Sequence, residues 1–498
     1  MSEDMYDIAI IGAGPGGYHA AIRAAQYDAN VALIEKEKLG GTCLNWGCIP
    51  TKSLYASAHM IQRLNEHGEE FGVECDNLNV NFEKAVDRKN EIVEELVKGI
   101  EGLQKAWDND VYYGHGKITG GNENDGYEIT VEGEETKSIK AMRVIIATGS
   151  SPALIPAFNI DHERILTSDD ILDPDFTTVP DKLLIIGAGV IGCEFANIFS
   201  TFGSEVECLE YLPSAIATEE RLVVRELMKR FDELGIEVRT SQNVLSVENT
   251  GSGVKATTCS ADIPQDEVED AEKNVYEADY CLVSIGRAKK SKDLGLDELG
   301  IETERGAINV DEETLESSAK GVYAIGDVTG GMMLAHVASY EGDIAVANAL
   351  ASLDKDFPIE AKTTDYSVVP ATIFTDPNIG SVGMTRKEAR EKGIKTIMGR
   401  YPYSALGKAL SMGEREGFIM ILADKETHKI LGASCIGAEA PELISEIAVA
   451  MENDLTIHDI GSVIHSHPTI SEMVLEGAED AIGKAIHKKG RPIHEHPE

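Results

Sequence analysis

The sequence predicts an α/β fold with two Rossmann-like dinucleotide-binding domains and a C-terminal α+β domain. Two observations support this prediction. A glycine-rich fingerprint between two short apolar runs occurs near residue 12 and again near residue 187. After about residue 370, short apolar runs and helical segments follow without a third fingerprint. A strand, a glycine-rich turn and a helix that recur in this way are typical of doubly wound parallel sheets.

The first fingerprint begins the chain. Residues 8–11 form an apolar run after Asp7 and lead into Gly12-Ala13-Gly14-Pro15-Gly16-Gly17, and a second apolar run, 31–34, ends at Glu35. The glycines permit a tight turn that brings the backbone close to a pyrophosphate, and the acid accepts a ribose hydroxyl. We therefore expect Gly12, Gly14, Gly17 and Glu35 to bind a dinucleotide.

A redox-active cysteine pair is predicted in the segment 40–52, which contains Cys43, Cys48 and Lys52. Two cysteines at this spacing could also be half of a zinc site or two inert thiols. Lys52 follows Cys48 by four residues, so the two share one face of a helix. Because a lysine can lower the pKa of a nearby thiol, we interpret the pair as a redox disulfide with a basic neighbour.

The fingerprint recurs after the apolar run 183–186, with Gly187, Gly189, Gly192 and Glu210 in the corresponding places. The acid follows the second glycine by 21 residues in both copies, 35 − 14 and 210 − 189. Two dinucleotide sites flanking a redox pair favour a flavin at one and a nicotinamide at the other. A carboxylate at position 210 accepts the free 2′-hydroxyl of NAD and repels the phosphate of NADP, so NAD is expected.

A proton-transfer pair is expected near the end of the chain, where His467 precedes a proline and Glu472 follows five residues later. A carboxylate orients a histidine and makes it a stronger base, and thiol–disulfide exchange needs a base. A surface histidine near a helix cap is the plain alternative. No metal site is predicted.

The composition bounds the possible partners and location. The 498 residues suffice for about three domains. The net charge of −41 argues against nucleic acid and anionic membranes as partners. We expect a cytoplasmic protein of a high-salt cell, an acidic mesophilic protein being the alternative. The first residues do not resemble a signal peptide, and no run of 18 apolar residues predicts a membrane span.

Together these motifs resemble the class I pyridine nucleotide-disulfide oxidoreductases, the disulfide-reductase family of flavoproteins, and within it the dihydrolipoyl dehydrogenases. The segments that carry the resemblance are 40–52, both fingerprints, 324–327, 334–336 and 465–469. The resemblance implies oxidation of dihydrolipoamide, on the lipoyl domain of an acyltransferase component of a 2-oxoacid dehydrogenase-type complex, with NAD⁺ as acceptor. It also implies a homodimer whose active sites are shared across the interface.

The resemblance assigns roles to individual residues. Cys43 would exchange with the substrate and Cys48 would contact the flavin, while His467 of the partner subunit, paired with Glu472, would be the base. Contacts to FAD are implied for Glu35, Lys52, Gly116, Asp327 and Ala335. The NAD site would be lined by Gly187, Gly189, Glu194, Glu210, Val244 and Gly286. The sequence departs from the family at Trp46, at His19 and after Arg287.

The resemblance also implies a division of the chain. We expect an FAD-binding domain at 1–155, an NAD-binding domain at 156–280, a segment at 281–355 that completes the FAD domain, a dimerisation domain at 356–476 and a tail at 477–498. Alternative functions are an NAD(P)H-dependent reductase of another disulfide or of mercuric ion, and a non-catalytic structural role. Mercury would call for cysteines near the C-terminus, and the last one is Cys435.

Overall fold

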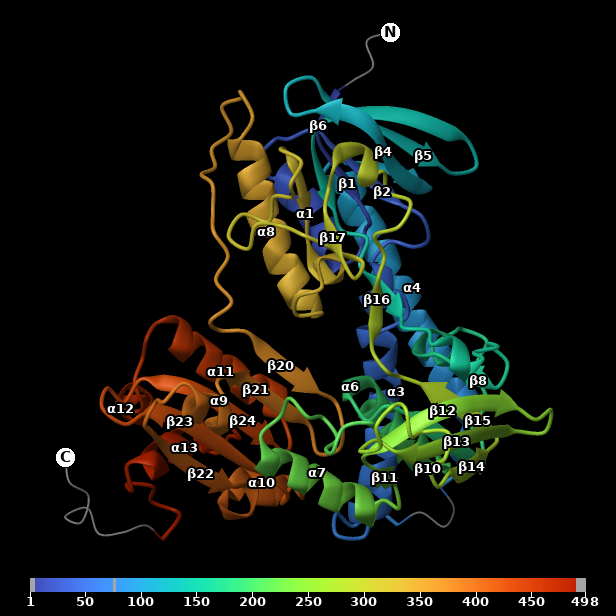
Figure 1. The fold of residues 1–498 in the computed structure, drawn as a ribbon. Helices are drawn as coiled ribbons and strands as arrows, with labels where there is room; N and C mark the ends of the chain where they lie inside the picture. The colour runs from blue at the N-terminus through green and yellow to red at the C-terminus, as the bar shows by residue number, and fades with distance from the viewer. Residues whose placement is uncertain (1–4, 75–77, 490–498) are drawn as a thin grey trace.

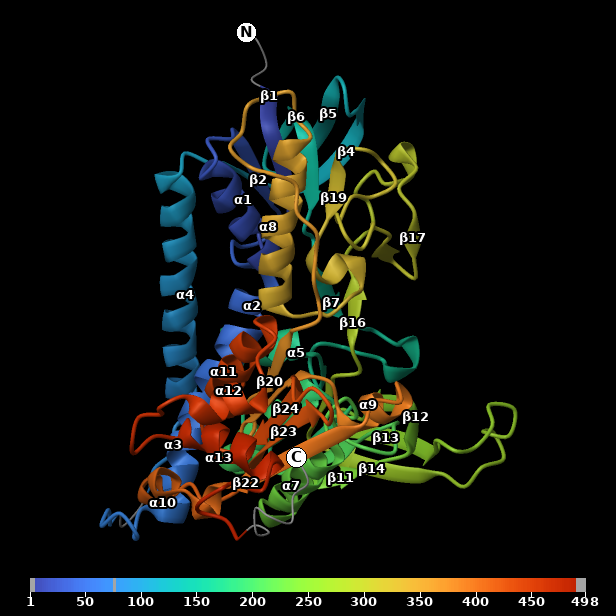
Figure 2. The same ribbon diagram turned by 90° about the vertical axis from the view of Figure 1, so that its left-hand side faces the viewer.

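Three large sheets, one in each domain, organise the chain in a computed structural model, which describes residues 5–74 and 78–489. The sheet whose strands flank the first fingerprint lies at one end of the molecule. The sheets of the second domain and of the C-terminal domain lie side by side at the opposite end (Figure 1). The long helices α3 (Cys48–His67) and α4 (Phe82–Ala106) pack against each other, with α4 extending along the first sheet and α3 toward the opposite end (Figure 2). In the described ranges, no helix has the length and apolar character that a membrane span requires.

The first sheet is parallel at its centre, in the order β3-β2-β1-β6 with β19 beside β6, and the antiparallel β5 and β4 extend it. Strand β2 is buried along its whole length, as an apolar run without alternation predicts. Helices α1 and α8 lie side by side against this sheet (Figure 2). The elements are β1 (Met5–Ile11), α1 (Pro15–Ala25), β2 (Val31–Glu35), β3 (Asp110–Tyr113), β4 (His115–Asn122), β5 (Gly126–Glu132), β6 (Thr136–Ile146), β19 (Val322–Ala324) and α8 (Ala335–Ala351).

The second sheet is entirely parallel, in the order β11-β10-β9-β15-β8, and carries a separate antiparallel sheet β12-β13-β14. Its last strand in the chain, Tyr280–Val283, pairs with β9, so the sheet extends three residues beyond the expected boundary at 280. The elements are β8 (Ile165–Leu166), β9 (Lys182–Ile186), α6 (Val190–Phe202), β10 (Glu205–Leu209), α7 (Arg221–Glu233), β11 (Glu237–Arg239), β12 (Gln242–Asn249), β13 (Val254–Ser260), β14 (Asn274–Ala278) and β15 (Tyr280–Val283).

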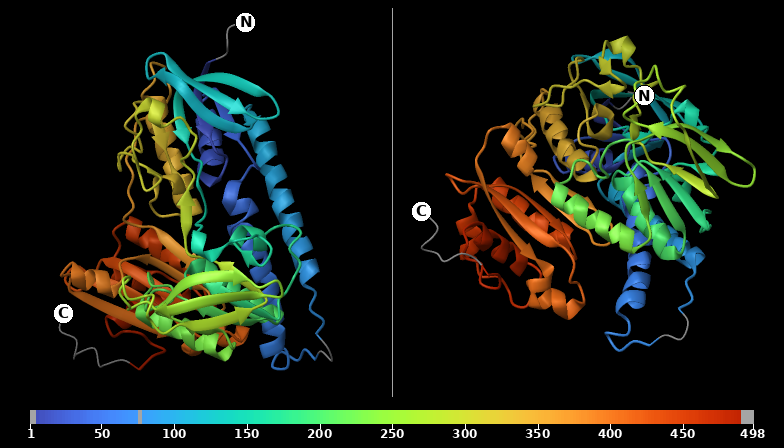
Figure 3. Two further views of the ribbon diagram at one scale, coloured as in Figure 1. Left: turned by 45° about the vertical axis from the view of Figure 1, so that its right-hand side comes forward. Right: turned by 60° about the horizontal axis from the view of Figure 1, so that its bottom comes forward.

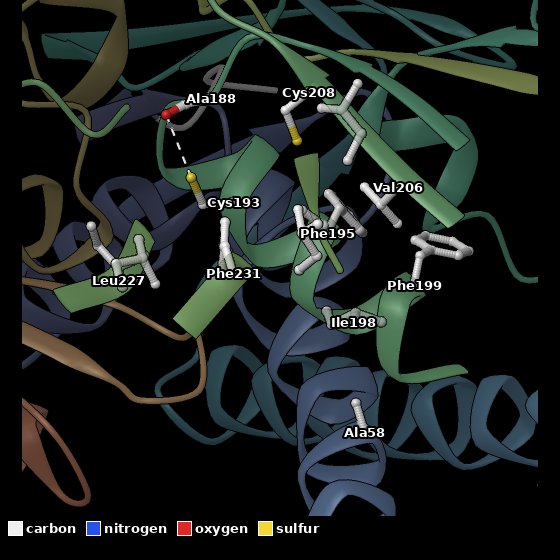
Figure 4. Packing of buried hydrophobic residues seen from close by; sticks show 14 of the residues in the cluster. Ala58, Ala188, Cys193, Phe195, Ile198, Phe199, Val206, Cys208, Leu227 and Phe231 are labelled. Atoms are coloured by element: carbon white, nitrogen blue, oxygen red, sulfur yellow. Dashed lines mark hydrogen bonds between the residues drawn. The ribbon is translucent and has the colours of Figure 1, made fainter. Parts of the chain in front are cut away.

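Helix α6 joins the second domain to the first. Phe195, Phe199 and Cys193 on this helix are buried in one hydrophobic cluster with Ala58 of α3 (Figure 4). The Cys193 thiol donates a hydrogen bond to the carbonyl of Ala188 at 3.4 Å. Cys193 therefore packs as a small core residue, as its apolar surroundings in the sequence suggest.

The C-terminal domain is an antiparallel sheet in the order β20-β21-β24-β23-β22 with helices packed on it. It lies beside α7 (Figure 3), and Phe418 and Ile436 share a hydrophobic cluster with Phe231 of that helix. The elements are β20 (Pro370–Ile373), β21 (Ile379–Gly383), α9 (Arg386–Glu391), β22 (Thr396–Pro402), α10 (Gly407–Met412), β23 (Phe418–Asp424), β24 (Ile430–Ile436), α11 (Ala440–Glu452), α12 (Ile457–Ser462) and α13 (Glu472–Ala481).

The chain passes from the first domain to the second and returns along a neighbouring path. Strands β7 (Ser150–Pro152) and β16 (Arg287–Lys289) pair antiparallel and form these two crossings. Residues from segments far apart in the sequence therefore meet at the boundary of the two domains. The short helices α2 (Gly41–Asn45) and α5 (Ser168–Ile171) lie near this boundary (Figure 2).

Candidate active site

The first fingerprint forms a cradle at the carboxyl end of β1. Gly12 has φ +103°, and a Cβ there would lie 2.4 Å from the carbonyl oxygen of Ala147. A Cβ on Gly14 would meet no atom closer than 3.9 Å, so space remains open at the N-terminus of α1. An anion placed there would face unpaired backbone N–H groups and the positive end of the helix dipole.

The second fingerprint repeats this geometry at the carboxyl end of β9. Gly187 has φ +99°, and a Cβ there would lie 2.5 Å from the carbonyl oxygen of Ser284. A Cβ on Gly189 would meet nothing within 4 Å, so the N-terminus of α6 is also open. The chain thus holds two cradles of one design, each fit for a pyrophosphate.

The two predicted acids hold their turns in the same way. Glu35 accepts hydrogen bonds from the backbone N–H of Ala13 and of Glu37, each at 2.8 Å. Glu210 accepts from the N–H of Ala188 at 2.6 Å and of Leu212 at 2.7 Å. Burial raises the pKa of Glu35, while its backbone partners favour the carboxylate. Each oxygen keeps acceptor capacity for a ribose hydroxyl.

A single cavity of about 1540 Å³ extends from the first cradle to the cysteine pair. Most of the residues predicted for FAD line it, namely Gly12, Gly14, Glu35, Lys52, Gly116, Asp327 and Ala335. Gly17 does not, because it packs behind the turn, where a Cβ would lie 1.8 Å from the carbonyl oxygen of Gly12. The volume and the open cradle fit FAD, and these residues would hold it.

A polar group at the domain boundary was not foreseen from the sequence. Ser150 donates a hydrogen bond to Asp327 at 2.5 Å and accepts one from the guanidinium of Arg287 at 2.7 Å. The Arg287 and Asp327 side chains are 3.9 Å apart, and all three residues line the cavity. No spacing signal could reveal this group, because β7 and β16 bring together residues from the two crossings.

The residues predicted for NAD are more scattered. Among them Glu194 alone lines the large cavity, and the glycines at 187, 189 and 192 form the second cradle. Val244 lies half-buried in β12, and Gly286, with φ +123°, lies in the return crossing after β15. These positions surround the carboxyl edge of the second sheet, where α/β folds bind nucleotides.

The cysteine pair lies on the wall of the cavity, Cys43 in α2 and Cys48 at the first position of α3. Both are thiols in the structure. A hydrogen bond from Cys43, with the charge of Lys52, lowers the pKa of Cys48 to about 7 although burial opposes this. The hydrogen bond to Cys48 and burial raise the pKa of Cys43. A negative charge on the pair is therefore favoured on Cys48, and the helix N-terminus supports it there.

Lys52 is fixed by a carboxylate from the second domain. Its ammonium donates to both carboxylate oxygens of Glu194 at 2.9 Å. The Glu194 side chain is only 4 % exposed, whereas that of Lys52 is 28 % exposed and faces the cavity. A buried pair of this kind gives the lysine one position rather than many, so its charge acts on Cys48 from a fixed place.

Aromatic side chains surround the pair. Trp46 lines the cavity, and the Lys38 ammonium lies 5.7 Å from the centroid of its ring. Tyr18 is half-buried, and burial, followed by the electrostatic interaction with Cys43, raises the pKa of its hydroxyl. His19 packs edge-on against Tyr18 at 4.7 Å. Of these two departures from the family, Trp46 lines the cavity with the cysteines, whereas His19 does not line it.

His467 and Glu472 are joined in the structure. Nδ1 of His467 lies 2.8 Å from Glu472, which also accepts from the N–H of Thr469 at 3.0 Å. Burial raises the pKa of Glu472, but these two hydrogen bonds outweigh it and the pKa is lowered. The His467 side chain is 78 % exposed and lies outside the cavity of its own chain.

The segment before His467 and helix α11 expose aliphatic side chains. Ile464 is 97 % exposed, and Val449 and Val463 are also exposed. A monomer would leave these aliphatic side chains in water, so the patch is typical of a surface that another subunit covers.

Two open nucleotide cradles, and two cysteine thiols on the cavity wall whose pKa values are shifted in opposite directions, define an FAD- and NAD-using disulfide oxidoreductase. The family comparison agrees. Residues 6–342 match the pyridine nucleotide-disulphide oxidoreductase model, and residues 369–478 match the dimerisation domain of the same family. The chain belongs to this family and is an oxidoreductase. Since it carries the dimerisation domain, it forms a homodimer.

Curated relatives and solved structures match the chain along nearly its whole length. The dihydrolipoyl dehydrogenase of Bacillus subtilis is 40% identical over 97% of this chain and 99% of the relative. That of Haloferax volcanii is 38% identical over 97% and 98%. The structure of LpdA from Mycobacterium tuberculosis superposes with a TM-score of 0.86 at 26% identity, covering 95% and 98% of the two chains. The flavoprotein disulfide reductase RclA from Escherichia coli gives 0.81 at 26%, covering 95% and 99%.

Proposed function

We propose that this chain oxidises dihydrolipoamide to lipoamide with NAD⁺ as acceptor, through the Cys43–Cys48 disulfide and FAD. The observation that carries the proposal is the Cys43–Cys48 pair on the wall of the cavity that fits FAD, with the pKa of Cys48 lowered and the pKa of Cys43 raised. The identity of the substrate is inferred from the curated relatives, which are dihydrolipoyl dehydrogenases at 38–40% identity. The balanced reaction is dihydrolipoamide + NAD⁺ → lipoamide + NADH + H⁺.

In the proposed cycle, His467 of the partner subunit takes the proton from one substrate thiol. The resulting thiolate attacks Sγ of Cys43, the Cys43–Cys48 bond breaks, and Cys48 leaves as a thiolate stabilised by Lys52. The second substrate thiol then attacks the substrate sulfur bound to Cys43 and closes lipoamide, the mixed disulfide breaks, and Cys43 leaves and takes up the proton of that thiol. The proton on His467 is the one released. When bound, FAD would supply transfer of the two electrons to NAD⁺ as a hydride, and the Cys43–Cys48 disulfide forms again as the pair gives up those electrons.

The test of the proposal is a substrate comparison with purified holoenzyme at high salt. We expect bound flavin, and NADH formation with dihydrolipoamide and NAD⁺ that is much faster than with other dithiols or with NADP⁺. A protein without flavin, or one that oxidises unrelated dithiols equally well, would contradict the proposal. The likeness to RclA makes reduction of another disulfide with NAD(P)H the second candidate. Oxidation of NADH or NADPH in the presence of other disulfides measures this activity.

Glu210 should determine the choice of nucleotide. Its carboxylate lies at the end of β10 beside the second cradle, where it would accept the 2′-hydroxyl of NAD and repel a 2′-phosphate. We expect Glu210→Ser to lower kcat/KM for NAD⁺ by about 10- to 100-fold, the cost of one charged hydrogen bond.

The matched control is Glu210→Gln, which keeps the shape and one acceptor but removes the charge. It should improve the use of NADP⁺ relative to NAD⁺ while losing less activity than the serine variant. Equal losses for both nucleotides in both variants would show that residue 210 supports only the turn.

The partner of the homodimer in the cell is proposed to be the lipoyl domain of an acyltransferase component in a 2-oxoacid dehydrogenase-type complex. The proposal rests on the curated relatives, which are dihydrolipoyl dehydrogenases. We keep the division into domains as proposed from the sequence, with the second domain extended to include β15. The end of the proposed tail, residues 490–498, lies outside the described residues.

We further propose a location in the cytoplasm of a salt-accumulating cell. The net charge of −41 and the haloarchaeal relatives support it. Because salt screens repulsion among carboxylates, the free energy of unfolding should increase steeply between about 0.1 and 2 M KCl.

Denaturant unfolding at several KCl concentrations measures this dependence, and a non-ionic osmolyte serves as the control. Excluded solutes also stabilise proteins, so only an effect much larger with KCl than with the osmolyte reflects charge screening. Full stability at low salt would rule out the high-salt location.

A further inference from the structure

The dimerisation domain of each chain reaches into the redox centre of the same chain. Strand β20 ends at Ile373, and the next residue, Phe374, lines the cavity with Lys52 and Glu194. The Lys52 ammonium lies 4.8 Å from the centroid of the Phe374 ring. The backbone N–H of Phe374 donates to Glu194 at 2.9 Å. One residue of the third domain thus contacts both members of the Lys52–Glu194 pair.

We propose that Phe374 is a positioning residue of the redox centre, which holds Lys52 so that the ammonium charge acts on Cys48. The proposal rests on the redox role proposed for the cysteine pair. The face of an aromatic ring attracts a cation, and the attraction is larger where water is excluded. Among the described residues, Glu194 and the Phe374 ring are the two groups that contact the Lys52 ammonium, so the ring helps Glu194 to hold it in place.

The segment that carries Phe374 is itself fixed against the other two domains. The Tyr55 ring of α3 packs edge-on against the Phe374 ring at 6.2 Å, and the Tyr55 hydroxyl accepts from Asn378 at 2.7 Å. The N–H of Asp376 donates to Asn197 of α6 at 2.5 Å. Because contacts to both nucleotide domains hold this segment, the ring has one position.

Two charges act on Cys48 in opposite directions, and Phe374 touches both of their sources. Lys52 lowers the pKa of Cys48, and Glu194 raises it. If the ring is removed, water enters beside Lys52 and screens its attraction for the thiolate. The Cys48 thiol should then lose its proton at a higher pH.

The experiment measures alkylation of Cys48 by iodoacetamide against pH, in reduced holoenzyme without lipoamide. All variants carry Cys43→Ser, so that Cys48 is the one thiol of the pair, and mass spectrometry identifies the modified peptide. We expect Phe374→Leu to raise the midpoint and to slow alkylation at pH 7 about two- to five-fold, as a rise of about half a unit to one unit requires. Phe374→Tyr keeps the ring and should restore the midpoint.

A double-mutant cycle separates this role from a general structural one. Lys52→Met should raise the midpoint by itself, and Phe374→Leu added to it should cause no further shift, because the ring acts through the ammonium. An unchanged midpoint in Phe374→Leu, or an equal shift with and without Lys52, would overturn the proposal. Phe374→Met provides a second variant if the leucine variant does not fold.

This outcome is independent of the substrate. If Cys48 titrates as expected but dihydrolipoamide is not oxidised, the proposed function fails and the role of Phe374 stands. If dihydrolipoamide is oxidised but the midpoint is the same in Phe374→Leu, the proposed function stands and the role of Phe374 fails.

Discussion

Replacing Cys48 or Cys43 by serine should abolish dihydrolipoamide-dependent formation of NADH, a loss of about 10⁴-fold or more, because no disulfide can then form. Both sulfurs are needed in the proposed cycle, one to form the mixed disulfide and one to leave as a thiolate. Steady-state assays of each variant, with flavin content measured beside them, test this expectation.

The cysteine prediction has a matched control and a pH signature. Cys259→Ala changes a thiol that is fully buried in β13, away from the cavity, and should retain turnover. In the native protein, alkylation of the reduced pair should increase with pH and be half-maximal near pH 7. The pKa of Cys48 is lowered to about 7, and below that pH the unreactive thiol form prevails. Turnover above background in either serine variant would overturn the proposed roles.

The second large effect is expected for His467→Gln, which should lower kcat by about 10²- to 10⁴-fold. Glutamine can still bond Glu472 but cannot take a proton. Since the His467 side chain is 78 % exposed, the change should leave the fold and the bound flavin intact. Glu472→Gln should cost less, because it removes only the group that orients the imidazole.

Mixed dimers show whether His467 acts on the partner subunit. A dimer of one Cys43→Ser chain and one His467→Gln chain contains one intact site if the base acts across the interface. If the base acts within its own chain, the mixed dimer contains none. Refolding or co-expressing the two inactive chains should therefore restore activity, up to half of the native value per mixed dimer. Absence of recovery in mixed dimers that are shown to form would contradict a shared site.

The nucleotide cradles could be predicted because their signal is local. The glycines of each fingerprint and the acid 21 residues after the second glycine lie within one strand–helix–strand unit. In such a unit, chain geometry alone brings the acid back to the turn, and the structure shows Glu35 and Glu210 bonded to the N–H groups of Ala13 and Ala188. The same reasoning applies to Lys52, one helical turn after Cys48.

The contacts that refine the site could not be predicted. Lys52 meets Glu194 across 142 residues of sequence, Ser150 meets Asp327 across 177, and Phe374 meets Glu194 across 180. Glu194 was expected to contact NAD, and the structure adds its bonds to Lys52 and to Phe374. No spacing rule extends beyond a few helical turns, so these pairs depend on how three separate sheets pack.

The amino-acid sequence by itself determined the chemistry of this protein: two nucleotide cradles, a thiol pair with a basic neighbour, and a histidine–carboxylate pair. Each is a short segment whose backbone conformation follows from its own residues. The tertiary structure alone decided how these parts act together. It placed Phe374 and Glu194 around Lys52 and left His467 exposed, outside the cavity of its own chain. The reason is physical, because burial and charge at Cys48 arise from side chains that only the packing of the domains brings within reach.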